Sequence, residues 1–275
     1  DFGNSPKLAF VPAPRTLSRY IKFPKRLSNN KESYIFLSSL IHENIDKLFP
    51  GLQVRGCHQF RVTMNSNLVF DDEDLNDIKK SLTRLLPERK YSEAVRLEVA
   101  KDCPTDVLKY LKTQYKLTDL DIYKINGPVN LNRFYSIYDD IKLKALKFPE
   151  YKSKRESRYV NNKKEYFDYL KDNDIVLHHP YNDFKLVIGF IKAAVLDKKT
   201  RAIKQTIYRT SPNSEIIKLL IKAASRNISV TVVIELRAKF DEEQNIKIAK
   251  MLEDAGVQVT YGIRKYKTHA KALLV

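Results

Sequence analysis

The chain has 275 residues and a formal net charge of +17 at pH 7, because 50 Lys and Arg outnumber 33 Asp and Glu. This excess favours a polyanionic partner such as nucleic acid, acidic lipid headgroups or a chain of phosphates, although a solubilising surface would have the same composition. The hydrophobic fraction of 43% suffices for a buried core, and no run of about eighteen apolar residues marks a transmembrane helix. The two cysteines, Cys57 and Cys103, argue against a disulfide scaffold, and Cys and His do not occur at metal-binding spacing.

Residues 1–160 are predicted to form an α+β domain that ends in a basic linker. Prolines interrupt residues 1–30, where 20–24 is predicted to be a short edge strand. Apolar residues at helical or alternating spacing then indicate helices over 33–48, 75–86 and 105–115, and strands over 53–63, 94–99 and 121–125.

Two charged stretches in this region each allow two interpretations. Four consecutive carboxylates over Asp71–Asp74 suggest a metal site, but negative charge at the N-terminus of the next helix is the simpler account. Lys and Arg crowd residues 142–165, which fits either a solvated interdomain linker or a basic lip for a polyanion.

Residues 161–275 follow a different pattern, in which short apolar runs alternate with amphipathic helices. This alternation predicts an α/β domain with a mostly parallel sheet. The expected strands cover 174–177, 202–208, 230–236, 257–261 and 270–275, and the expected helices cover 182–196, 214–227 and 241–255.

Cationic residues follow several of these strands. In a parallel sheet, binding groups gather just beyond the carboxyl ends of the strands. Arg209 follows one strand and Lys239 follows the next, while Lys267 precedes the last one. We therefore expect a phosphate-binding crevice, in which Glu235 and Asp241 orient these cations or help to hold a magnesium ion. For Glu235 the alternative is an N-cap-type or salt-bridge role.

The pair His269 and Lys271 adds a chemical group to this crevice. If residues 268–275 form a strand, side chains two positions apart share one face. An imidazole can attack phosphorus, and a neighbouring ammonium can hold the phosphoryl oxygens. By itself, H-x-K in a lysine-rich chain also fits a plain surface histidine.

The order of several motifs resembles the polyphosphate kinase family, the large bacterial type whose catalytic half is similar to phospholipase D. In the second region the matching segments are A-I-K-Q-T-I-Y-R at 202–209, V-V-I-E-L-R-A-K-F-D-E-E at 232–243, K-T-H-A-K at 267–271 and L-H-H-P-Y at 177–181. F-R-V-T at 60–63 and V-R-L-E at 95–98 extend the resemblance over the first region.

The resemblance implies a fold and a reaction. Residues 1–160 would be the family's α+β head domain with its basic linker, and 161–275 its first phospholipase D-like catalytic domain, truncated at the C-terminus of a longer protein. The family transfers the γ-phosphoryl group of ATP reversibly to inorganic polyphosphate, with Mg²⁺. It further implies a homo-oligomer in the cytoplasm, peripheral association with the inner membrane face, and no nucleic-acid partner.

The resemblance also assigns site residues. His269 matches the phosphohistidine nucleophile and Lys271 completes the H-x-K pair, while Lys267 joins the phosphate-binding group. Arg209 matches one of two arginines assigned to the magnesium site, and Lys239 stands where the family has the second. Because a guanidinium does not ligate a cation, we interpret Arg209 and Lys239 as a phosphate clamp beside the metal, in which lysine keeps the charge but lacks the bidentate fork.

Two other functions stay open at this level. A phospholipase D-like phosphodiesterase acting on nucleic acid or lipid would use the same histidine and pass the phosphoryl unit to water. A non-catalytic basic module would only bind polyanions.

Overall fold

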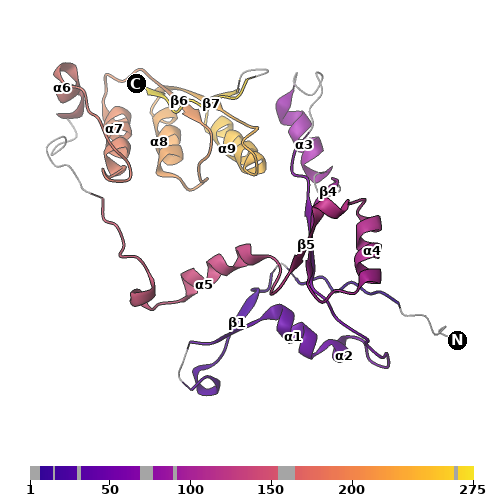
Figure 1. The fold of residues 1–275 in the computed structure, drawn as a ribbon. Helices are drawn as coiled ribbons and strands as arrows, with labels where there is room; N and C mark the ends of the chain where they lie inside the picture. Colours follow the sequence, from indigo (N-terminus) through magenta and orange to yellow (C-terminus); the bar gives the residue numbers. More distant parts are fainter. Residues whose placement is uncertain are drawn as a thin grey trace. The chain divides into compact units, whose positions relative to one another are not determined.

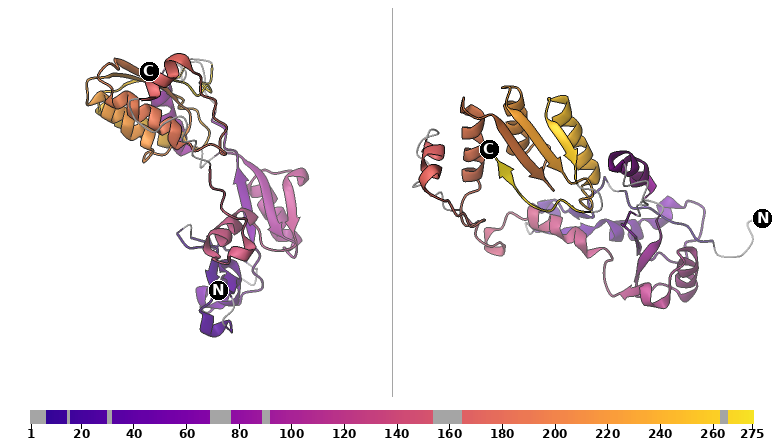
Figure 2. Two further views of the ribbon diagram at one scale, coloured as in Figure 1. Left: turned by 90° about the vertical axis from the view of Figure 1, so that its left-hand side faces the viewer. Right: turned by 90° about the horizontal axis from the view of Figure 1, so that it is seen from above.

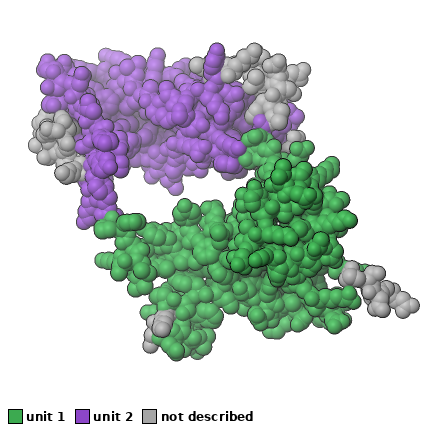
Figure 3. Space-filling model, viewed as in Figure 1, with its two compact units in different colours: residues 1–67, 89–149 green, residues 68–88, 150–275 purple. Residues whose placement is uncertain are grey.

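The computed structural model describes residues 7–14, 16–29, 32–68, 77–88, 92–153, 165–262 and 266–275. The chain divides into two compact units (Figure 3), of which unit 1 comprises residues 1–67 and 89–149, and unit 2 comprises residues 68–88 and 150–275. This division differs from the expected single boundary near residue 160, because residues 68–88 leave the first region and join the second unit. The acidic run Asp71–Asp74 and residues 154–164 of the basic stretch lie outside the described residues.

Unit 1 contains two small sheets and several short helices. Its strands are β1 (Tyr20–Lys22), β2 (Tyr34–Phe36), β3 (Phe60–Met64), β4 (Ala94–Ala100) and β5 (Ile122–Ile125). Its α-helices are α1 (Leu37–Glu43), α2 (Ile45–Leu48), α4 (Thr105–Gln114) and α5 (Tyr135–Asp140), as labelled in Figure 1. Short 3-10 helices cover Lys25–Leu27, Asp119–Asp121, Leu131–Phe134 and Lys144–Leu146.

The pairing in unit 1 corrects two expectations. The helix expected over 33–48 is wrong at its start, because residues 34–36 pair with β1 as an antiparallel strand. It is also interrupted at Asn44, whose side-chain amide donates to the Leu40 carbonyl oxygen at 2.9 Å. The strand expected over 53–63 covers only 60–64, where it pairs antiparallel with β4. On the other side of β4, β5 runs parallel.

Unit 2 is the α/β region predicted from the sequence. Its sheet has the order β8-β7-β6-β9. Strands β6 (Ala202–Ile207), β7 (Ser229–Ile234) and β8 (Gln258–Tyr261) are parallel, and β9 (Leu273–Leu274) is antiparallel to β6, so the expectation of a mostly parallel sheet is confirmed for the described strands.

Unit 2 also contains several helices. They are α3 (Ile78–Glu88), α6 (Glu165–Asp172), α7 (Lys185–Leu196), α8 (Glu215–Ala224) and α9 (Glu242–Asp254). Helices α7, α8 and α9 lie side by side, with α8 against β7 and α9 against β8 (Figure 2). Burial alternates along β7: Val230, Val232 and Ile234 are buried in the core, whereas Thr231 and Val233 on the other face are half-buried. None of the described helices has the length and apolar character needed to cross a bilayer.

One expected strand of unit 2 is wrong. Residues 174–177 form no strand, and the Val176 side chain is 86% exposed. Because no described strand lies next to residues 174–177, they lack the ladder hydrogen bonds that would hold them as a strand. Helix α6 was not predicted from the sequence. It attaches to α7 through Tyr166, whose hydroxyl donates to the Leu186 carbonyl oxygen at 2.9 Å.

Helix α3 lies between β3 and β4 in the sequence but packs on unit 2. Leu82 is fully buried in the core cluster of unit 2. The Lys79 ammonium donates to Glu253 at 3.0 Å and to the Tyr261 hydroxyl at 2.8 Å. The hydrogen bond between Lys79 and the Tyr261 hydroxyl raises the pKa of Lys79. A second hydrogen bond, between the Tyr261 hydroxyl and Glu253, lowers the pKa of Glu253. A helix from the first region therefore completes the α/β unit beside α9 and β8.

Candidate functional site

Tyr208 follows the last residue of β6 and forms the centre of a cluster of predicted site residues. Its ring lies edge-to-face with the His269 ring, with centroids 4.6 Å apart. The Lys271 ammonium lies 4.6 Å from the same ring centroid and the Arg209 guanidinium carbon 5.7 Å from it. The Tyr208 ring therefore has a histidine and two cations around it, at the carboxyl end of the central strand β6.

The segment that carries His269 is extended, but it is not a strand. The expected strand over 270–275 is limited to Leu273–Leu274, and residues 267–272 have no regular ladder. Thr206 holds this segment with both its backbone and its side chain. Its N–H donates to the Ala272 carbonyl oxygen at 3.0 Å, and its hydroxyl donates to the Ala270 carbonyl oxygen at 2.7 Å and accepts from the Ala272 N–H at 2.8 Å. The Lys271 ammonium in turn donates to the His269 carbonyl oxygen at 2.6 Å. His269 and Lys271 still flank one ring, as their two-residue spacing suggested.

Arg209 is held in place from the loop that follows β7. Its Nε lies 3.2 Å from the Asp241 carboxylate, and its Nη2 donates to the Lys239 carbonyl oxygen at 3.0 Å. The Arg209 side chain is still 53% exposed, so part of its guanidinium faces solvent. Contact with Lys239 is therefore through the main chain, while the exposed Lys239 ammonium lies 5.5 Å from the Phe240 ring centroid. Lys267 is exposed, and no described contact joins it to the Tyr208 cluster.

Glu235, considered from the sequence as a magnesium ligand, has a buried carboxylate that is bound by backbone N–H groups. Its side chain is 2% exposed, and each carboxylate oxygen accepts a backbone N–H: Oε1 from Arg237 at 2.8 Å and Oε2 from Thr268 at 2.7 Å. Asp241 pairs with Arg209. Within the described residues, no group of three or more His, Cys, Asp and Glu side chains is placed to hold a metal ion. Magnesium requires oxygen ligands, so these residues fit a phosphate better than a metal held by protein groups.

Sequence analysis assigned no role to two residues that build this site, Tyr208 and Asn245. Asn245 on α9 is fully buried, and its amide donates to the carbonyl oxygens of Tyr208 at 2.9 Å and Glu235 at 2.8 Å. It therefore ties the ends of β6 and β7 together. A signal was present, because Asn245 shares the apolar face of α9 with Ile248 and Leu252, three and seven residues later.

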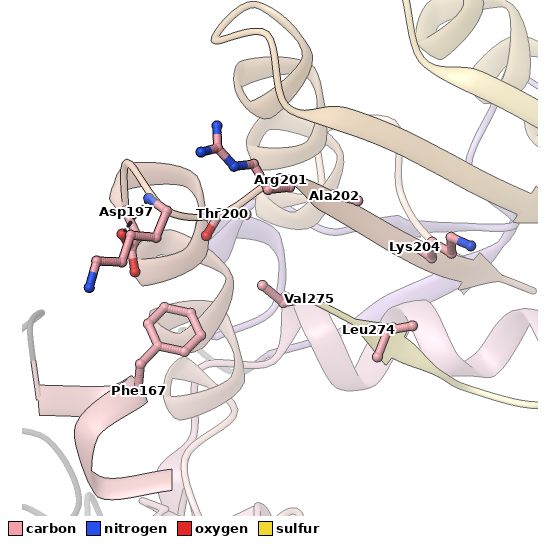
Figure 4. Close-up of a pocket in the computed structure, with 9 residues that line it drawn as sticks. Phe167, Asp197, Thr200, Arg201, Ala202, Lys204, Leu274 and Val275 are labelled. Atoms are coloured by element: carbon pink, nitrogen blue, oxygen red, sulfur yellow. Dashed lines mark hydrogen bonds between the residues drawn. The ribbon is translucent and has the colours of Figure 1, made fainter. Parts of the chain in front are cut away.

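A hollow of about 510 Å³ lies elsewhere on unit 2, at the start of β6 (Figure 4). Its walls are Phe167, Asp197, Lys199, Thr200, Arg201, Ala202, Lys204, Leu274 and Val275. Because β6 runs away from it toward Tyr208, the hollow contains none of the predicted site residues.

Two family models match this chain. The "Polyphosphate kinase middle domain" covers residues 1–137, and the "Polyphosphate kinase C-terminal domain 1" covers residues 165–275. The chain belongs to the polyphosphate kinase family. Helix α3 falls within the match to the middle domain, although it packs on the unit that contains the match to C-terminal domain 1.

Curated relatives named polyphosphate kinase agree with this membership. The protein from Pseudomonas aeruginosa is 43% identical over 274 residues, which is 100% of this chain and 40% of the relative. The one from Xylella fastidiosa (strain 9a5c) is 44% identical over 275 residues, or 100% of this chain and 39% of the relative. The chain thus spans about 40% of the length of the relatives it matches.

A solved structure shows the same fold. The crystal structure of polyphosphate kinase from Porphyromonas gingivalis matches with a TM-score of 0.72 at 22% identity, over 94% of this chain and 36% of that chain. At this level of identity the match concerns the fold alone.

Proposed function

We propose that this chain carries the phosphoryl-accepting histidine of a polyphosphate kinase, which transfers the γ-phosphoryl group of ATP reversibly to inorganic polyphosphate. The observation that supports this most is the placement of His269 beside Lys271 and Arg209 around Tyr208, in a chain of this family. Because the chain spans about 40% of its relatives, the activity is proposed for a protein of their full length that carries this sequence. A homo-oligomer and peripheral membrane association stay predictions of the resemblance.

His269 would act as the nucleophile in a two-step transfer. In the first step a neutral ring nitrogen of His269 attacks the γ-phosphorus of ATP, an N–P bond forms, and the bridging P–O bond breaks as ADP leaves. In the second step a terminal oxygen of polyphosphate attacks the same phosphorus, the N–P bond breaks, and the imidazole is regenerated. His269 is exposed, so phosphate chains can reach it.

The cations would orient the phosphoryl group and offset its charge. Lys271 acts as a point charge beside His269, and Arg209 adds a planar fork that is already oriented by Asp241 and by the Lys239 carbonyl oxygen. Fixed cations of this kind stabilise phosphoryl transfer mainly by positioning and electrostatics. Lys239 and Lys267 extend the positive surface along the phosphate chain.

Magnesium would enter this site with the phosphates of its substrate. It is commonly bound through one or two carboxylates together with substrate phosphates, and the described site offers a single partly exposed carboxylate, that of Asp241. When bound, the ion neutralises phosphate charge; the residues described above position the reacting groups.

The test is polyphosphate synthesis from ATP by the full-length protein and its His269→Gln variant. We expect synthesis by the parent and by the matched control His178→Gln, which changes an exposed histidine of the same unit, and no synthesis by His269→Gln. Release of nucleotides or headgroup alcohols without polyphosphate would instead identify a phosphodiesterase. Polyphosphate binding without turnover, equally strong in His269→Gln, would identify a binding module.

A further inference from the structure

We propose that Glu235 is a positioning residue for this transfer: its ionised carboxylate holds the main chain at Thr268 and thereby sets His269 against Tyr208. The inference rests on the proposed function, since it assigns a role within the same site. Glu235 touches neither His269 nor Lys271 in the described structure, so it acts through the residue next to the nucleophile.

The hydrogen bonds of Glu235 require a carboxylate. The side chain is 2% exposed, and a buried polar group without partners is costly. Both of its partners, the Arg237 and Thr268 backbone N–H groups, are donors only. Two acceptor oxygens satisfy both donors, whereas the amide of a glutamine would place its own NH₂ against one of them.

Arg237 provides a second hold on the same segment. Its Nε lies 3.6 Å from Glu235 Oε1, which places a compensating positive charge beside the buried carboxylate. Its Nη2 donates to the Tyr266 carbonyl oxygen. The residues that follow β7 therefore bind the main chain at residues 266 and 268, three and one positions before His269.

Gly262, the residue after β8, lies beside the same carboxylate. It has φ +56°, a left-handed conformation that suits glycine, and a Cβ there would lie 3.6 Å from Glu235 Oε2 and 3.7 Å from Thr268 Oγ1. The end of β8 therefore lies next to the hydrogen bond between Glu235 and Thr268.

The same network fixes the ring against which His269 rests. The Asn245 amide donates to the carbonyl oxygens of Glu235 and Tyr208. One side chain therefore fixes the main chain of both the Tyr208 ring and the residue that binds Thr268. Loss of the hydrogen bond from Thr268 to Glu235 would therefore move His269 relative to Tyr208 and Lys271, while Asn245 keeps Tyr208 in place. A misplacement of about 1 Å at a reacting group can cost about 100-fold in rate.

The experiment compares Glu235→Gln with Glu243→Gln in the full-length protein. Glu243 is a matched control because it is an exposed carboxylate on α9, paired only with Lys247 in the described contacts. With γ-labelled ATP and Mg²⁺, we expect Glu235→Gln to slow single-turnover labelling of His269 about 10- to 100-fold while the KM for ATP changes less than about threefold. Glu243→Gln should label at the parental rate. Hydrogen exchange should increase at Thr268 and stay unchanged in β6 and β7.

Each other result overturns the inference. Parental labelling by Glu235→Gln, or a defect confined to KM, would leave the proposed function standing and refute the positioning role. Absence of labelling in the parent would refute both. If Glu235→Gln does not fold, Arg237→Lys decides the question, because it keeps the positive charge but loses the Nη2 donor to Tyr266. That variant should label at least about threefold more slowly with a folded core, and a parental rate would overturn the proposal.

Discussion

Replacing Leu82 by alanine tests the assignment of α3 to unit 2. The Leu82 side chain is 0% exposed and lies in the core cluster of the α/β unit. Leu→Ala substitutions at buried sites cost about 2–5 kcal/mol, depending on how far the surroundings collapse. Helix α3 packs at the margin of this core, against α9, so we expect a loss of about 2–3 kcal/mol.

Native-state hydrogen exchange, measured by mass spectrometry, shows which unit loses stability in Leu82→Ala. A single unfolding midpoint does not, because the chain has two units. A loss of about 2–3 kcal/mol corresponds to about 30- to 160-fold faster exchange through global opening, expected in peptides from β7 and α9. Peptides from β4, in unit 1, should be unchanged. The control Val176→Ala removes an 86% exposed side chain of unit 2 and should stay within about 0.5 kcal/mol of the parent. Faster exchange in β4 with protection retained in β7 would refute the assignment.

Three further predictions concern the site and the attachment of α3. Lys239→Arg should preserve or raise polyphosphate synthesis because it adds a bidentate fork; a loss of more than about tenfold, or roughly 1.4 kcal/mol, would show that the site is adapted to lysine. Affinity for long-chain polyphosphate, which we expect near Arg209, Lys239 and Lys271, should fall steeply as salt rises, and a flat salt dependence would argue against an electrostatic groove. Hydrogen bonds from Tyr261 and Lys79 lower the pKa of Glu253, so its contribution is present above the usual pKa of about 4.3 and is lost as pH falls through the lowered value. Acidification should therefore increase intrinsic-rate-corrected hydrogen exchange of α3 in the parent more than in Glu253→Gln, and equal increases would contradict this.

The α/β unit could be predicted well from the sequence because its elements have strong local patterns. The apolar run of β7 and the stripe of α9 that ends before Gly256 each specify an element within a few residues. The helix of α3 was also predicted, but its place was not. Its partners Glu253 and Tyr261 lie 174 and 182 residues away from Lys79, and helical spacing carries no information about such distant contacts.

Part of the candidate site was predicted, but the contacts that hold its residues together differ in part from those expected. Two-residue spacing suggested a common face for His269 and Lys271. Both side chains do lie against the Tyr208 ring, but the Thr206 hydroxyl and a single Thr206–Ala272 backbone hydrogen bond hold the segment, and not a full strand ladder. The role of Glu235 was open because sequence does not show which oxygens face N–H donors. Burial and two backbone hydrogen bonds distinguish a structural carboxylate from a metal ligand.

Mapping the phosphorylated residue tests the central claim most directly. The full-length protein is incubated with γ-labelled ATP and Mg²⁺, and the acid-labile, base-stable label expected of an N–P bond is located by peptide mapping. Nearby cations offset the charge of the incoming phosphate. We predict that the label maps to His269 and that His269→Gln loses both label and polyphosphate synthesis while its fold is retained. Normal synthesis by His269→Gln, or a label on another histidine of this chain such as His178 or His179, would contradict the account.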